Sequence, residues 1–341
     1  MEKLLMPLMS KLQVTIVKLF VYSVILVIIG SSTAKAGYIY TTIRDPNSVN
    51  TYAFGINNAG QIVGKSDAAA YVYNGGVFSA LDLPFAVNFA TATGINNSGQ
   101  IAGFYSDSTG GHGFVKSGGN YTTLEVPGAS FTYATGINDS GDVAGYYYAT
   151  QDIAGVPTIR QRGFVKSGGV YRTIDAPGAG VTQTYAAGIN NSGQVAGTFY
   201  DGTKYKGFIE VGGVFTILDH YASGTWVYGI NNLGDVVGYY EDAGQSGGVV
   251  GGAFVKSGGV YTRIQNPDSY NSSSTQAWGI NDLGQIVGYY NSASNPNGWY
   301  GFLATPDGSN AVVPEPSMSV VASALLGLGY VWRRRKTRRT N

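Results

Sequence analysis

Short stretches that alternate apolar and polar residues recur along the middle of the chain, separated by clusters of Gly, Asn and Ser. Within them one motif, Gly-Ile-Asn-[Asn/Asp]-x-Gly-[Gln/Asp]-[Ile/Val]-[Val/Ala]-Gly, occurs at successive spacings of 39, 42, 52, 41 and 50 residues. Its copies begin at Gly55, Gly94, Gly136, Gly188, Gly229 and Gly279. Self-similarity at such a period indicates a repeat architecture, in which each copy is one supersecondary unit.

Each unit contains candidate strands rich in Val, Ile, Thr, Tyr and Phe and bounded by Gly, Asn, Asp or Pro. Examples in their order along a unit are Thr225–Tyr228, Gln285–Tyr290, Gly163–Lys166 and Tyr171–Ile174. Turns such as Asn96–Gly99 supply the positive φ that short hairpins require. The third unit contains extra residues, Tyr148–Gln161, between its second and third strands. Because this insertion is confined to one place in the unit, it predicts a loop.

Four strands in about 40 residues match one blade of a β-propeller. The sixth unit ends after its third strand, Gly301–Leu303, whereas a lone fourth strand, Tyr40–Ile43, precedes the first unit. Pairing these two fragments would complete the last blade and cover its open edges. We therefore predict an all-β domain over residues 37–311, a six-bladed β-propeller of four-stranded blades whose last blade is closed by the N-terminal strand.

Charge is distributed unevenly, although the formal net charge is only +1. Residues 37–311 have a net charge of −7, whereas residues 1–36 and 312–341 have +3 and +5. The first of these ends combines lysines, the apolar run Leu19–Ile29 and an A-x-A site at Ala34 and Ala36. This order predicts a secretory signal peptide over residues 1–36, with an uncleaved membrane anchor as the alternative.

Residues 312–341 contain three features in a fixed order: Pro314-Glu315-Pro316, the uncharged stretch Met318–Trp332, and a basic block that begins with Arg333, Arg334 and Arg335. The stretch predicts a short transmembrane helix. The basic block would remain on the cytoplasmic side and stop transfer. A plain C-terminal membrane anchor is the alternative interpretation of the same features.

These three features resemble the PEP-CTERM sorting signal of Gram-negative bacteria, and the Gly-Ile-Asn units resemble the extracellular HAF repeats. The resemblance implies export by the Sec translocon, processing by an exosortase at Pro314, Glu315 and Pro316, and transient residence in the inner membrane. It further implies a final location in the cell envelope or outside the cell.

Candidate chemistry is sparse, because the chain has 0 Cys and 2 His. Carboxylates end the fourth strands at Asp45, Asp82, Glu125, Asp175 and Asp219. One acid per unit could offer oxygen ligands to Ca²⁺. The favoured interpretation is that these acids stabilise the turns that follow the fourth strands. We therefore expect no catalytic residue, no metal site, no enzymatic activity and no cofactor other than a possible Ca²⁺.

Tyrosines follow the second strand of several units, as in Tyr146–Tyr148, Tyr239–Tyr240 and Tyr289–Tyr290. Because strand residues alternate between faces, one Tyr of each pair packs within the blade and the next reaches a surface or the central channel. Exposed tyrosines beside Asn and Ser could stack on carbohydrate, although packing between blades is the alternative.

We expect a secreted, exosortase-sorted protein of the envelope or extracellular matrix, with a structural or adhesive role in an exopolysaccharide biofilm or floc. The alternatives are a polysaccharide-binding propeller module and, third, a glycan-active hydrolase or lyase. Exopolysaccharide is thus an expected partner. Nucleic acid is not, because the basic residues gather in the two terminal segments that orient export.

Overall fold

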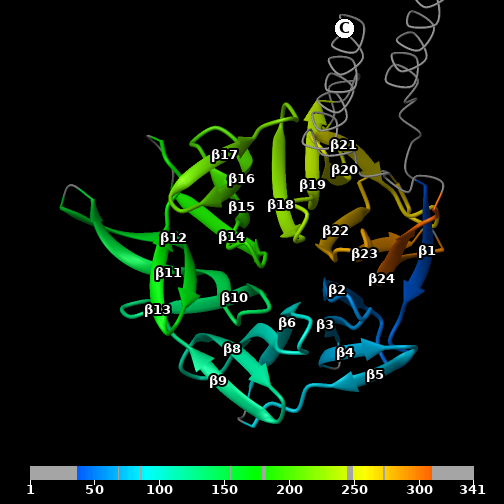
Figure 1. The fold of residues 1–341 in the computed structure, drawn as a ribbon, viewed down its shortest axis with the longest axis horizontal. Coiled ribbons are helices and arrows are strands. Elements are labelled where there is room, and N and C mark those ends of the chain that lie inside the picture. Colours follow the sequence, from blue (N-terminus) through cyan, green and yellow to red (C-terminus); the bar gives the residue numbers. More distant parts are fainter. Residues whose placement is uncertain are drawn as a thin grey trace, which may run out of the picture. The chain divides into compact units, whose positions relative to one another are not determined.

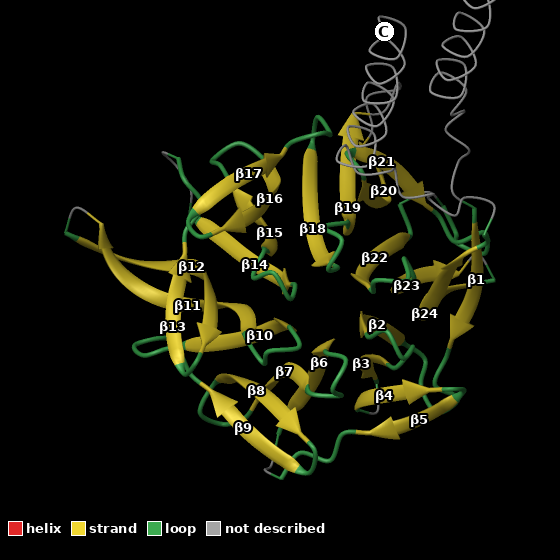
Figure 2. Cartoon of the chain, in the orientation of Figure 1, coloured by secondary structure: helices red, strands yellow, loops and turns green. Residues whose placement is uncertain are grey.

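The structure, a computed structural model, describes residues 37–308 apart from residues 68, 85–86, 154, 179–181, 244–248, 272 and 293. Every regular element in these described residues is a β-strand, and the all-β prediction is confirmed (Figures 1 and 2). Residues Tyr38–Thr305 form one unit, to which the following description applies.

Each copy of the motif contributes its own group of antiparallel strands. The first two groups are β2 (Thr51–Ile56), β3 (Ile62–Ser66), β4 (Ala70–Asn74) and β5 (Val77–Ala80), then β6 (Phe89–Ile95), β7 (Ile101–Ser106), β8 (Gly111–Ser117) and β9 (Asn120–Leu124). The next two are β10 (Phe131–Ile137), β11 (Val143–Ile153), β12 (Val156–Ser167) and β13 (Val170–Ile174), then β14 (Gln183–Ile189), β15 (Val195–Tyr200), β16 (Tyr205–Val211) and β17 (Val214–Leu218).

The last two groups are β18 (Gly224–Ile230), β19 (Val236–Ala243), β20 (Val249–Ser257) and β21 (Val260–Ile264), then β22 (Thr275–Ile280), β23 (Ile286–Ser292) and β24 (Asn295–Pro306) with β1 (Tyr38–Ile43). The strand that enters the motif in each group lies innermost around a common centre (Figure 1); these strands are β2, β6, β10, β14, β18 and β22. The structure therefore has the propeller-like arrangement that the repeats predict.

The sheets differ from the expected set of separate four-stranded blades. Three sheets have four strands, but the second, third and fourth groups are joined in one twelve-stranded sheet. Two single parallel pairs make the connections, Gly111 with Phe131 and Gln161 with Gln183. In both, a residue of a third strand pairs with the first residue of the next innermost strand, which a repeat pattern alone does not reveal.

The N-terminal strand β1 occupies the edge of the last group, in the order β1-β24-β23-β22. Ile43 is only 1% exposed, and the Thr42 hydroxyl lies 3.0 Å from the Tyr290 hydroxyl. The Tyr40 hydroxyl also accepts a 3.2 Å hydrogen bond from the Gln265 backbone N–H of the preceding group. Strand β1 is thereby attached to two groups that lie more than 200 residues away in sequence.

The recurring glycines of the second strands are explained by the core. Phe114 on β8 is fully buried, and a Cβ added to Gly103 would lie 2.6 Å from its ring and 2.3 Å from the Thr91 carbonyl. The same stacking of a third-strand Phe on a second-strand Gly recurs at Phe164, Phe208, Phe254 and Phe302. Any larger side chain at these glycines would displace the core.

The prediction of a loop at Tyr148–Gln161 is wrong. These residues extend β11 and β12 into a long hairpin, which is paired in register from Tyr148 and Gln161 out to Ile153 and Val156. The insertion continues the strand alternation and so adds ladder hydrogen bonds to both strands. In Figure 2 the hairpin projects outward from the strands around it.

Candidate functional site

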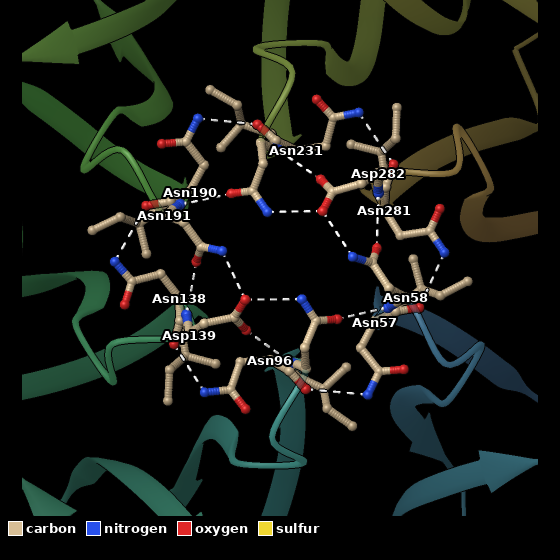
Figure 3. A pocket seen from close by; sticks show the side chains of 18 residues that line it. Asn57, Asn58, Asn96, Asn138, Asp139, Asn190, Asn191, Asn231, Asn281 and Asp282 are labelled. Atoms are coloured by element: carbon tan, nitrogen blue, oxygen red, sulfur yellow. Dashed lines mark hydrogen bonds between the residues drawn. The ribbon is translucent and has the colours of Figure 1, made fainter.

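The Asn of each Gly-Ile-Asn motif joins its unit to the next one. The side-chain amide of Asn57 donates to the backbone carbonyl of Asn96, and the equivalent bond recurs in every unit until Asn281 donates to Asn57 (Figure 3). The distances range from 2.9 to 3.2 Å, and the intermediate members are Asn138, Asn190 and Asn231. These bonds form a closed circuit through all six motifs.

The same Asn side chains also shape their own hairpins. In the second unit, Asn96 Oδ1 accepts from the Gln100 N–H at 2.8 Å, and its Nδ2 donates to Gln100 Oε1 at 2.8 Å. Gly99 completes this turn with a φ of 80°. The structural role that the sequence predicts for Asn and Gly is thus confirmed. The bond to the next unit was not predicted, although an Asn followed four residues later by Gln or Asp in every copy is its signal.

A second circuit lies one residue further along each motif. The backbone N–H of each residue donates to the side chain of its counterpart in the next unit, at 2.7–3.0 Å, through Asn58, Asn97, Asp139, Asn191, Asn232 and Asp282. Asp139 also accepts the side-chain amides of Asn97 and Asn191, as Asp282 does those of Asn58 and Asn232. Two carboxylates therefore satisfy the four amides around the circuit.

The hydrogen bonds of this second circuit affect the pKa of Asp139 more strongly than burial does. Burial by itself raises the pKa of Asp139, but the N–H of Asn97 and the amides of Asn191 and Asn97 bring the pKa below its usual value. Asp139 is therefore ionised and bound to its neighbours. Asp142, three residues further along, accepts instead from the side-chain amide of Asn138.

A β-bulge in each innermost strand turns one side chain toward the centre. The register shifts just before the motif Gly, which leaves the preceding residue unpaired, for example Thr93 between Ala92 and Gly94. The six bulge residues are Phe54, Thr93, Thr135, Ala187, Tyr228 and Trp278, and all of them line the central channel. Aromatic rings thus fill one half of this layer, whereas the other half holds small side chains.

An aromatic pocket of about 400 Å³ is lined in part by two of the aromatic bulge residues, Tyr228 and Trp278. Its lining includes Thr198 on β15, at a position where four other units carry Phe or Tyr. Five tyrosines and two tryptophans form most of its wall, among them Tyr148, Tyr205 and Trp226. Comparison of the units could have singled out the small side chain of Thr198, but not the pocket that the neighbouring units form around it.

The polar groups of the aromatic pocket are neutral. Two amides, Gln161 and Gln183, lie at its edge, and the Tyr205 hydroxyl donates to Gln183 Oε1 at 2.9 Å. Burial, assisted by nearby tyrosines, raises the pKa of Tyr146 and Tyr185 above the usual value near 10. The pocket therefore offers aromatic faces, amides and un-ionised hydroxyls, a combination that suits an uncharged polar ligand.

Because several tyrosines are buried, we expect the free energy of unfolding to fall at alkaline pH. Burial raises the pKa of Tyr185, Tyr228 and Tyr289, so the folded chain retains protons that the unfolded chain releases above about pH 10. Stability is then fully present below about pH 10, and each such tyrosine lowers it by about 1.4 kcal/mol per pH unit as pH rises further. Denaturant unfolding from about pH 8 to 12, with absorbance titration of the tyrosines, measures both effects. Ordinary titration of all tyrosines near pH 10 in the folded protein would contradict the prediction.

The tyrosine pairs alternate as predicted. Tyr147 is buried within its own group, whereas Tyr146 and Tyr148 face the aromatic pocket. Likewise Tyr290 is buried, and Tyr289 packs against Trp278 with the two ring centroids 6.0 Å apart.

The acids at the ends of the fourth strands do not converge. Asp45 accepts hydrogen bonds from Ser48 and Ser66, and Asp82 is exposed. The other three each pair with a base 13 residues earlier in the same unit: His112 with Glu125, Arg162 with Asp175, and Lys206 with Asp219. Within the part of the chain that is described, no group of three or more acid or His side chains is arranged to hold a metal ion.

The two histidines lie apart. His112 belongs to β8, where its Nδ1 lies 2.9 Å from Glu125 Oε1. His220 stacks on Tyr261 with ring centroids 4.1 Å apart. Glu241 and Asp242 are adjacent residues of β19, and adjacent side chains of a strand point to opposite faces.

The predicted trafficking residues lie outside the described residues. They are Ala34 and Ala36 of the cleavage site, Pro314, Glu315 and Pro316 of the sorting signal, and Arg333, Arg334 and Arg335 of the basic block. The predicted transmembrane helix Met318–Trp332 lies outside them as well. Among the residues that are described, none forms a helix able to cross a membrane.

Comparison with solved structures supports the fold. No protein-family model matches the chain, and no curated protein matches it in sequence. A protein of unknown function from Dyadobacter fermentans is similar in structure, with a TM-score of 0.51 and 12% identity over 80% of this chain and 100% of that one.

Two enzymes are also among the similar structures. One is a gluconolactonase from Xanthomonas campestris, with a TM-score of 0.44 and 10% identity over 81% of this chain and 92% of its own. The other is an α-L-arabinofuranosidase from Podospora anserina, with a TM-score of 0.35 and 10% identity over 79% and 96%. The expectation that this chain is not an enzyme is therefore corrected, since its structural neighbours include enzymes. Such distant likeness concerns the fold and assigns no reaction to this chain.

Proposed function

We propose that the repeat domain binds an uncharged stretch of polysaccharide in the aromatic pocket. The observation that carries this proposal is the lining of the pocket, in which tyrosines and tryptophans surround two glutamine amides and none of the described lining residues is charged. The apolar C–H face of a sugar ring packs on an aromatic ring, while its hydroxyls exchange hydrogen bonds with amides and tyrosine hydroxyls. The volume of about 400 Å³ lies within the usual range for ligand pockets.

Replacing Trp226 by Ala is expected to weaken retention on the exopolysaccharide of the producing strain by about tenfold or more, because its ring forms part of the pocket wall. Affinity electrophoresis of the full-length protein in gels that contain this polymer measures the effect. Trp299→Ala is the matched control, since Trp299 is similarly part-buried and contacts Tyr289 outside the pocket. Equal retention of the two variants, or no retention of the unmodified protein, would reject the proposal.

We further propose that the domain is a six-bladed ring whose last blade is completed by β1. The closed hydrogen-bond circuit through six motifs supports this proposal, as does the position of β1 beside β24. The bonds that join three groups into one twelve-stranded sheet are then local links between neighbouring blades.

We also propose that the chain is exported and sorted to the envelope or extracellular matrix, where the domain would meet exopolysaccharide. The order of the terminal features supports this proposal: a candidate signal peptide, then Pro314-Glu315-Pro316, an apolar stretch and an Arg block. Exosortase and the Sec translocon would be its partners during export.

Replacing Pro314, Glu315 and Pro316 by Ala is expected to leave the full-length protein in the inner membrane, because the processing site is lost. Cell fractionation followed by immunoblotting measures the length and location of the protein. The double substitution Ser309→Ala and Asn310→Ala, a few residues before the motif, is the nearby control and should be released normally. Normal release of the first variant would contradict the sorting proposal.

A further inference from the structure

A second hollow of about 300 Å³ lies beside the aromatic pocket, where β8 meets β10. Its lining combines the ring of Phe131 with polar side chains, those of Thr109, His112, Glu125, Ser130 and Thr132. Phe131 is 42% exposed although it is a large apolar residue. We refer to this hollow as the Phe131 pocket.

The linings of the two pockets meet at one pair of aromatic rings. Phe131 on β10 and Tyr148 on β11 are direct cross-strand partners, so their side chains stand on the same face. Their rings meet edge to face with centroids 6.2 Å apart, and Tyr148 lines the aromatic pocket. An aromatic surface therefore leads from one pocket to the other.

The polar side of the Phe131 pocket is held in place by a hydrogen-bonded cluster around His112. His112 Nδ1 lies 2.9 Å from Glu125 Oε1, and Nε2 lies 3.2 Å from Asp107 Oδ1 and 3.0 Å from Thr109 Oγ1. Hydrogen bonds from Thr109 and then His112 lower the pKa of Asp107 to about 2. The cluster fixes His112, which in turn orients Glu125 at the pocket.

Glu125 remains open to a ligand, in contrast to its counterpart in the next unit. Its side chain is 64% exposed and is held through one oxygen by His112. Both oxygens of Asp175 are engaged by the guanidinium of Arg162. A carboxylate beside an aromatic ring accepts hydrogen bonds from sugar hydroxyls while the ring packs on the sugar face.

We propose that the Phe131 pocket is a second sugar subsite, which binds the next part of the same polysaccharide chain that enters the aromatic pocket. This inference rests on the proposed function. It implies that the domain recognises a run of several sugar units along a chain and discriminates long fragments from short ones.

Binding of size-fractionated fragments tests the proposal, with short fragments that fill one pocket and long fragments that span both, prepared from the exopolysaccharide of the producing strain. Phe131→Ala and Glu125→Ala in the full-length protein are each expected to weaken the long fragment about three- to tenfold and to leave the short fragment unchanged. Tryptophan fluorescence titration measures both affinities, since Trp226 and Trp278 line the aromatic pocket.

The repeat supplies matched controls. Phe89 occupies the position equivalent to Phe131 and is 49% exposed, and Asp175 is the equivalent of Glu125. Phe89→Ala and Asp175→Ala should leave both affinities unchanged. Unaltered long-fragment binding by the Phe131 and Glu125 variants would overturn the second subsite, as would equal weakening of both fragments.

Failure of the proposed function would give a different result from failure of the second subsite. If Trp226→Ala leaves the binding of both fragments intact, or if the unmodified protein binds neither, the aromatic pocket is not the site and both proposals are rejected. If Trp226→Ala abolishes both while the Phe131 and Glu125 variants change nothing, the aromatic pocket stands and the second subsite falls.

Discussion

Asn96→Asp is expected to lower the free energy of unfolding at pH 7 by about 3–5 kcal/mol, although the substitution is nearly isosteric. Asn96 is 4% exposed, and its Nδ2 donates to Gln100 Oε1 and to the Asn138 carbonyl. An Asp would place a buried negative oxygen against these two acceptors. Asn96→Ala removes the bonds without adding charge and should cost less, about 1–3 kcal/mol.

Acid should partly rescue the Asp variant. The oxygen that replaces Nδ2 would be buried against two acceptors, which raises the pKa of the new carboxyl above its unfolded value near 4. The penalty is therefore present at neutral pH and disappears as pH falls toward about 4. Denaturant unfolding of Asn96→Asp at about pH 4 and pH 7 measures this difference. Asn120→Asp, at the exposed start of β9 where other units carry Val, is the control and should cost little at either pH. A loss below about 1 kcal/mol for Asn96→Asp at pH 7 would show that the circuit contributes little to stability.

Deletion of residues 37–46 is expected to abolish cooperative unfolding of the domain. The deletion removes β1 with its buried Ile43, whose loss alone corresponds to about 2–5 kcal/mol. It also removes Asp45, which accepts hydrogen bonds from Ser48 and Ser66, and leaves the edge of β24 unpaired. The total is comparable to the stability of a whole domain.

Thermal and denaturant unfolding of the deletion variant, followed by tryptophan fluorescence, measures the effect. Adding a synthetic peptide of residues 37–46 should restore the transition, which distinguishes loss of the strand from a general failure to fold. The same peptide with Ile43→Asp is the control and should not restore it. A cooperative transition at the original midpoint after deletion would exclude closure by β1.

Much of the fold is determined locally and could be predicted from the sequence. Alternating Val, Ile, Thr and aromatic residues specify the strands, and Asn with Gly specifies the turns, as Asn96 and Gly99 show. The lone strand Tyr40–Ile43 could be assigned to the last unit because its sequence matches the fourth strands of other units. The prediction of a loop at Tyr148–Gln161 was wrong, because the greater length of this unit does not reveal whether its inserted residues pair with each other.

The site was decided by tertiary structure. The sequence by itself showed six related units and their tyrosines, but each unit contributes only one part of the aromatic pocket or of the Asn circuits. Where Thr198 and Trp226 come to line one pocket, and where Phe131 meets Tyr148, depends on how neighbouring units and strands are placed around the centre. Strand and turn propensities act over a few residues, whereas a cavity depends on contacts between residues far apart in the chain. The sequence therefore determined the strands and their repetition, and only packing around the centre decided where one unit leaves a hollow.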